Sequence, residues 1–66
     1  MKIYVYEALF NDCIYEGGYV TLSIHNTEIG AKKALHHHEF NYLKNLGKVK
    51  KEEYQDWALK KTILQE

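Results

Sequence analysis

The residue types best suited to chemistry lie in the run His36-His37-His38-Glu39, because imidazoles and carboxylates are common zinc ligands. Successive residues of a helix point about 100° apart, so three neighbours cannot converge on one ion. The H-E-x-x-H spacing, which puts two imidazoles on one helical face, is absent. We therefore expect no metal site and no cofactor, with His36 and His37 in solvent and His38 at the edge of the core.

Nucleophilic catalysis has one candidate pair, Cys13 with a histidine. Asp12 precedes this cysteine, and a neighbouring carboxylate disfavours the reactive thiolate. Glu7 and Glu16 could form an acid–base pair, but any two acids of the chain could do the same. The sequence therefore predicts a protein that is not an enzyme and has no catalytic residues.

Basic residues could mark a nucleic-acid surface, and the lysines cluster at Lys32, Lys33, Lys44, Lys48, Lys50 and Lys51. The chain has no arginine, which is the usual reader of bases and phosphates, and its formal net charge is zero. Glu52, Glu53 and Asp56 follow the lysines directly. A solvated surface is therefore favoured. A small nucleic-acid-associated regulatory protein stays the alternative function, beside a small-molecule sponge with its site at a dimer seam.

The first half of the chain predicts a β-hairpin. Two apolar runs, Lys2–Phe10 and Tyr15–His25, alternate with the period of a strand. Both faces of Lys2–Phe10 are largely apolar, as in a central strand that is covered on both sides. Turn residues at Asn11-Asp12-Cys13 and Gly17-Gly18 make the connection longer than a two-residue turn. The aliphatic side chains expected to meet a helix are Ile3, Val5, Val20, Leu22 and Ile24.

A helix is predicted to follow, from a cap at Asn26 or Thr27 to a C-terminal cap at Gly47. Glu28 suits its first turn. The stripe expected to face the core recurs at three- and four-residue steps: Ala31, Ala34, Leu35, His38, Tyr42 and Leu46.

The last apolar segment, Trp57–Gln65, fits two structures. A strand would align Trp57, Leu59, Lys61 and Ile63, whereas a helix would align Tyr54, Trp57, Ala58, Lys61 and Leu64. We favour the strand, because a two-stranded sheet is marginal and a third strand completes it. The predicted fold is one α+β domain over residues 1–66. Its order is strand, strand, helix, strand, with the helix on one face of a three-stranded antiparallel sheet.

Aromatic residues supply the candidate protein-binding surface. Tyr4, Tyr6 and Tyr19 are predicted to share the sheet face away from the helix, with Phe10 or Trp57 alongside. Tyrosine and tryptophan are enriched in interface hot spots, and small proteins rarely leave contiguous apolar patches in water. A chain of 66 residues lies near the lower size limit for folding alone, so we expect a homodimer.

The compartment is expected to be the cytoplasm. The one cysteine excludes an intrachain disulfide, which is typical of a reducing setting. No apolar leader segment is present, and no run approaches the ~18 apolar residues of a membrane span.

Four stretches together resemble short ββαβ miniproteins of bacteriophages and bacteria: Met1–Glu7, Gly17–Val20, Asn26–Ala34 and Ile63–Glu66. The resemblance covers nearly the whole chain, but these motifs specify a fold rather than a chemistry. Some phage proteins of this size block bacterial immune systems, and the chain resembles the anti-defence inhibitors of the Hachiman system. The resemblance implies a non-enzymatic phage protein that binds and inhibits a host defence protein, such as an immune effector or a helicase-type component. The polar connection 48–56 and the histidine run depart from the pattern.

Overall fold

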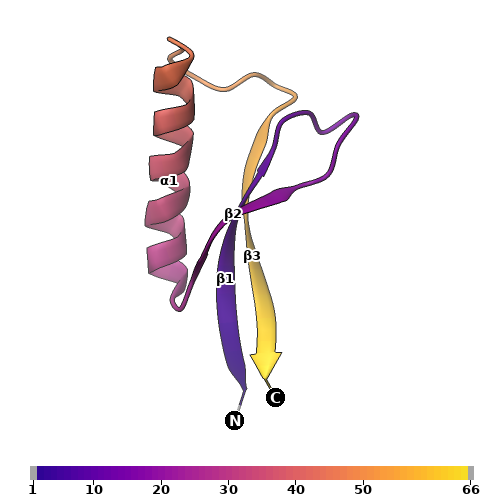
Figure 1. The fold of residues 1–66 in the computed structure, drawn as a ribbon, viewed down its shortest axis with the longest axis vertical. Helices are drawn as coiled ribbons and strands as arrows, with labels where there is room; N and C mark the ends of the chain where they lie inside the picture. Colours follow the sequence, from indigo (N-terminus) through magenta and orange to yellow (C-terminus); the bar gives the residue numbers. More distant parts are fainter. Residues whose placement is uncertain (1, 66) are drawn as a thin grey trace.

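Three strands and one helix make up the computed structural model, which describes residues 2–65 (Figure 1). In chain order they are β1 (Ile3–Asn11), β2 (Val20–His25), α1 (Glu28–Asn45) and β3 (Asp56–Gln65). The sheet has the order β2-β1-β3, and both pairs of neighbouring strands are antiparallel. The predicted α+β fold is confirmed, and the helical alternative for residues 57–65 is wrong.

β1 is the central strand, as its two apolar faces predict. It pairs with β3 along its whole length, from Ile3 opposite Gln65 to Asn11 opposite Asp56. β2 is shorter and covers only the second half of β1. The β1–β2 register shifts at Leu22, which forms a bulge with no partner residue on β1.

Both ends of α1 follow the predicted signals. The Thr27 hydroxyl accepts a hydrogen bond from the Gly30 amide at 3.1 Å, which satisfies a donor of the first turn. Gly47 has φ +70°, and the following amide of Lys48 donates to the Leu43 carbonyl at 2.8 Å. This pattern closes the helix in a Schellman motif, in which glycine takes the left-handed conformation without steric cost.

The helix packs on the side of β1 that carries Ala8 and Phe10. The Phe10 ring lies 4.9 Å from that of Tyr42 on α1 and 4.5 Å from that of Trp57 on β3, measured between centroids. Ala8 and Ala31 are fully buried between the two layers. The core therefore consists of small residues at its centre and an aromatic cluster at one end.

The predicted orientation of the sheet is wrong. Val20, Leu22 and Ile24 are exposed by 56%, 38% and 62%, while the polar Ser23 and His25 lie on the helix side. The bulge at Leu22 interrupts the alternation, and the packing of Phe10 on Tyr42 selects which face of β1 meets the helix.

The predicted helix stripe needs one correction. Leu43 is buried against the sheet, whereas Leu46 is half exposed. Leu46 is the C-terminal cap residue, at the point where the helix ends. The other stripe residues are at least partly buried, as predicted.

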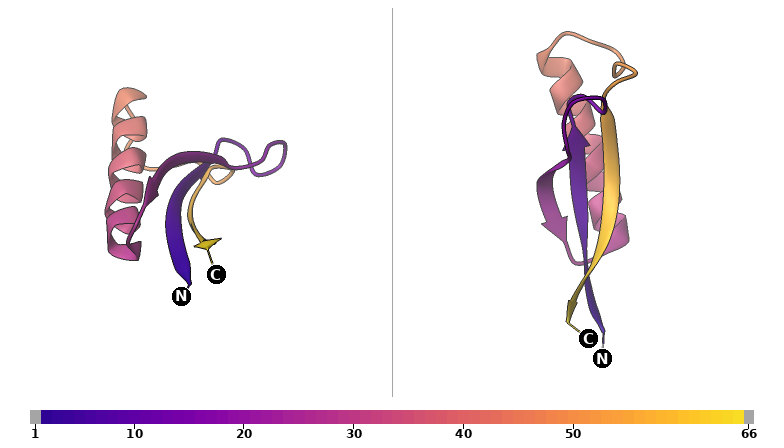
Figure 2. Two further views of the ribbon diagram at one scale, coloured as in Figure 1. Left: turned by 60° about the horizontal axis from the view of Figure 1, so that its bottom comes forward. Right: turned by 90° about the vertical axis from the view of Figure 1, so that its right-hand side faces the viewer.

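The molecule is elongated, because β1 and β3 continue past the N-terminal end of α1 toward the two ends of the chain (Figure 1). The Cα atoms span 44 × 24 × 13 Å. The side view in Figure 2 shows the helix behind the sheet, and the described part of the chain places no layer on the opposite face. Within residues 2–65, no helix is both long and apolar enough to cross a membrane.

Candidate functional site

The four aromatic residues predicted to form one surface lie in three places. Tyr4 and Tyr6 project from the helix side of β1, and Trp57 belongs to the aromatic core cluster. Tyr19 lies at the opposite face, where its hydroxyl donates a hydrogen bond to the Asp56 carboxylate. That hydrogen bond raises the pKa of the Tyr19 phenol. The expectation of a shared face is therefore wrong.

A smaller exposed surface surrounds Tyr4 at the end of the β1–β3 ribbon that the helix leaves uncovered. We call this surface the ribbon end, and it consists of Ile3, Tyr4, Lys61, Ile63 and Leu64. Ile63 and Leu64 are exposed by 44% and 68%. The Lys61 ammonium lies 4.2 Å from the centroid of the Tyr4 ring, in a cation–π contact. The ribbon end is therefore an apolar surface with one cation, which its contact with the Tyr4 ring holds in place.

A serine and two histidines meet where β2 packs on α1. The Ser23 hydroxyl oxygen lies 2.7 Å from Nε2 of His25 and 3.0 Å from Nε2 of His38. A serine next to an imidazole is also the arrangement that activates a nucleophile. Here the three groups are partly buried and link a strand to the helix, so we assign them a structural role. His38 lies at the edge of the core, as predicted.

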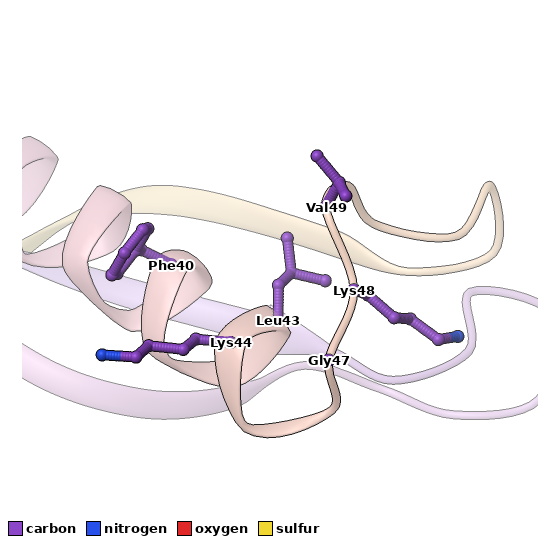
Figure 3. Close-up of a pocket in the computed structure, with 6 residues that line it drawn as sticks. All are labelled: Phe40, Leu43, Lys44, Gly47, Lys48 and Val49. Atoms are coloured by element: carbon purple, nitrogen blue, oxygen red, sulfur yellow. The ribbon is translucent and has the colours of Figure 1, made fainter.

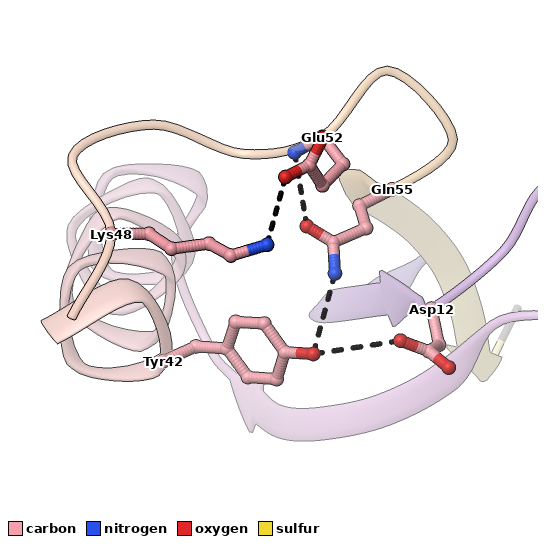
Figure 4. Close-up of polar contacts among 5 residues, drawn as sticks. All are labelled: Asp12, Tyr42, Lys48, Glu52 and Gln55. Atoms are coloured by element: carbon pink, nitrogen blue, oxygen red, sulfur yellow. Dashed lines mark hydrogen bonds and ion pairs between the residues drawn. The ribbon is translucent and has the colours of Figure 1, made fainter. Parts of the chain in front are cut away.

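A polar cluster joins the end of α1 to the connection before β3 (Figure 4). The Gln55 side-chain amide donates to the Tyr42 hydroxyl at 3.3 Å, and its carbonyl accepts from the Glu52 amide at 3.1 Å. Lys48 forms an ion pair with Glu52 at 2.8 Å, which raises the pKa of Lys48 and lowers that of Glu52. The sequence suggested a solvated connection, but these contacts tie it to the helix.

Two buried polar residues were missed by sequence reasoning. Asn11 and Gln55 are exposed by only 3% and 5%. Asn11 stands in a turn cluster and Gln55 in a charged segment, where polar residues are normally solvated. Their burial follows from the hydrogen-bonding needs of the loop backbone, which must be satisfied wherever water is excluded. The Asn11 side chain donates to the Gly17 carbonyl and accepts from the Cys13 amide.

A groove of about 470 Å³ lies between the C-terminal end of α1 and the connection that follows. Figure 3 shows Phe40, Leu43 and Val49 around it, with Lys44 and Lys48 extending to either side. Its volume is in the range of small-molecule sites. Its lining residues include no carboxylate, hydroxyl, thiol or imidazole, so the groove offers apolar contact and the attraction of two lysines for an anion.

The face of the sheet opposite the helix carries a carboxylate that two hydrogen bonds hold in position. Glu7 accepts hydrogen bonds from the hydroxyls of Thr21, at 3.1 Å, and Thr62, at 3.0 Å. These threonines come from the two strands that flank β1. The carboxylate is therefore fixed at the centre of this face.

The basic surface is partly neutralised. Lys32 pairs with Glu28 at 3.2 Å, and Lys48 pairs with Glu52. Within residues 2–65 no cluster of three histidine, cysteine, aspartate or glutamate side chains is arranged to hold a metal ion. No protein-family model, curated protein or solved structure matches this chain.

Chelators are expected to leave stability unchanged. His36 and His37 are exposed on α1, so replacing both with alanine should change the free energy of unfolding by less than ~0.5 kcal/mol. Urea unfolding with and without EDTA measures both effects. As the matched comparison, His38→Ala removes a partner of Ser23 and should cost about 1–3 kcal/mol. A lower free energy of unfolding in EDTA would reveal a metal site.

Proposed function

We propose that this chain is a non-enzymatic protein that inhibits a bacterial defence protein by binding it through the ribbon end. The observation that carries this proposal is the incomplete cover of the sheet. β1 and β3 extend beyond α1, and their exposed side chains there include Ile63 and Leu64. Apolar side chains that the fold does not use are available to a partner.

The composition of the ribbon end supports recognition of a protein rather than a nucleic acid. Tyr4 supplies a large ring at low entropic cost, and Lys61 supplies one positive charge beside it. Phosphate binding needs several free cations in one surface. The resemblance to phage ββαβ inhibitors supports a defence protein, such as a helicase-type component, as the target.

The test is a phage-plating assay in bacteria that carry a Hachiman-type defence system. Expression of the chain should restore plaque formation, and Ile63→Asp should abolish the restoration. Val49→Asp is the matched control, because Val49 is 99% exposed and lies outside the ribbon end. With the purified defence protein, Ile63→Asp should weaken binding at least about 30-fold, as expected of a hot spot worth about 2 kcal/mol. Equal behaviour of the two variants, or no restoration by the natural chain, would contradict the proposal.

A further inference from the structure

We propose that the face of the sheet opposite the helix is the surface through which two copies of this chain form a dimer. We call it the open face, and its central residues are Val5, Glu7, Leu9, Ile24, Ala58 and Lys60. Cross-strand pairing places them together, since residues directly opposite each other share a face. The inference does not depend on the proposed target, because Tyr4, Lys61 and Ile63 of the ribbon end lie on the helix side and, among its paired residues, only Ile3 is on the side of Val5.

The sequence of β1 indicates that this face is covered. Val5 and Leu9 lie on it, on either side of Glu7, while Ala8 and Phe10 lie on the helix side, so β1 carries apolar residues on both sides. Strands of this kind are found in sheets with a layer on each face. Residues 2–65 supply only one layer, which is α1 (Figure 2).

The single chain exposes more surface than a compact monomer should, by about the area that one interface would cover. The accessible surface is 5080 Å², whereas a compact monomer of this mass exposes about 4,400 Å². The excess is close to the ~800 Å² that each partner buries in a protein interface of standard size. The radius of gyration is likewise large, at 13.1 Å, against about 11 Å for a compact domain of this length.

Ile24 provides the clearest apolar contact. It lies opposite Glu7 and is 62% exposed, so most of its side chain is in water in the single chain. Val5, Leu9 and Ala58 surround the same region. Packing two such faces together would form a sandwich of two sheets, about 10 Å apart, with the helices outside.

Charge complementarity identifies the occupant as a second copy. Glu7 and Lys60 are directly opposite each other on β1 and β3, yet they form no ion pair, because the Glu7 carboxylate is held by Thr21 and Thr62. Within residues 2–65, Lys60 makes no side-chain hydrogen bond or ion pair. A twofold axis between β1 and β3 would place Glu7 over the partner's Lys60, and Lys60 over the partner's Glu7. The face is thus complementary to itself.

The charges set the arrangement and the apolar residues supply the buried area. Ion pairs removed from water contribute little net stability, but they discriminate strongly against like charges. The two threonines keep the carboxylate in one position before association. We therefore expect the Glu7–Lys60 pair to select the register of the dimer.

The test is the mass of the full chain in solution, measured by sedimentation equilibrium at micromolar concentration without any target. The natural chain should have twice the 7.8 kDa mass of one copy. Ile24→Lys should be monomeric and still folded by circular dichroism. Ile29→Lys is the matched control, because Ile29 is similarly exposed, by 69%, but lies on α1. It should remain a dimer.

A charge exchange tests the register. Glu7→Lys should weaken the dimer at least about tenfold, since it brings like charges together across the axis. Lys60→Glu combined with Glu7→Lys should restore association. A monomeric natural chain, a dimer that persists in Ile24→Lys, or a double variant no tighter than Glu7→Lys would overturn the proposal. A natural chain that stays monomeric while plating is restored would overturn the dimer and leave the proposed function intact.

Discussion

Replacing Trp57 with alanine is expected to remove a large part of the free energy of unfolding. The Trp57 ring lies 4.5 Å from that of Phe10 and 5.5 Å from that of Tyr42, so this residue joins β3 to β1 and to α1. Removing a large aromatic side chain from a core typically costs 3–5 kcal/mol, about 4 kcal/mol at the centre of the range. A domain of this size is stable by only about 3–10 kcal/mol in total.

Few other contacts can replace the lost ring. Among residues 2–65 no large side chain is fully buried, and the buried apolar residues there are Ala8, Ala31 and Leu43. Urea unfolding followed by circular dichroism measures the loss. Tyr15→Ala is the control, since Tyr15 lies in the exposed hairpin connection and should change stability by less than ~0.5 kcal/mol. Similar losses in both variants would show that the aromatic cluster does not hold the layers together.

Asn11→Asp should cost about 3 kcal/mol at neutral pH, although it changes neither the size nor the shape of the side chain. The Asn11 amide donates to the Gly17 carbonyl at 3.0 Å, and its oxygen accepts from the Cys13 amide at 3.1 Å. The substitution turns the donor into a negatively charged oxygen that faces a carbonyl oxygen. Asp56, the cross-strand partner of Asn11, adds repulsion.

The loss should depend on pH with a defined sign. Burial without a cation disfavours the carboxylate, so its pKa is higher in the folded than in the unfolded chain. The penalty is therefore full at neutral pH and falls as the pH drops through the folded pKa, toward and below about 4. Urea unfolding of the variant and of the natural chain, at neutral pH and at about pH 4, gives the difference in free energy of unfolding at each pH. Asn41→Asp, on an exposed position of α1, should show almost no penalty, and an equal loss there would exclude this mechanism.

The order of the elements could be predicted because the hairpin and the helix depend on local signals and the last strand on a simple requirement of sheet stability. Thr27 and Gly47 mark the ends of α1 by their capping chemistry, which acts within a few residues. The strand at 57–65 was favoured by a global requirement, the need for a third strand. These signals do not depend on how the layers later pack.

The orientation of the sheet could not be predicted in the same way. The alternation in β2 favours Val20, Leu22 and Ile24 as core residues, and in a regular strand they would share one face. β1 is apolar on both sides and cannot decide. The contact of Phe10 with Tyr42 and Trp57 determines which face of β1 meets the helix. Phe10 and Trp57 are 47 positions apart in the chain. Local periodicity carries no information about such a contact.

The candidate surfaces were missed for the same reason. Parity alone groups the tyrosines and predicts Tyr19 beside Tyr4, whereas the Tyr19 hydroxyl binds Asp56 on the other side of the sheet. The ribbon end exists because α1 begins after β2 and covers only part of β1 and β3 (Figure 1). That offset depends on where β2 ends along β1, which the sequence pattern does not specify.

The serine between two histidines couples the link between β2 and α1 to a residue of the same strand. Ser23 and His25 both belong to β2, so only the Ser23–His38 bond crosses to the helix. The Ser23 hydroxyl has a single proton, so it can donate to at most one of the two Nε2 atoms, and at least one ring must donate from its own Nε2. When His25 takes the serine proton, His38 must therefore be the donor that keeps strand and helix joined.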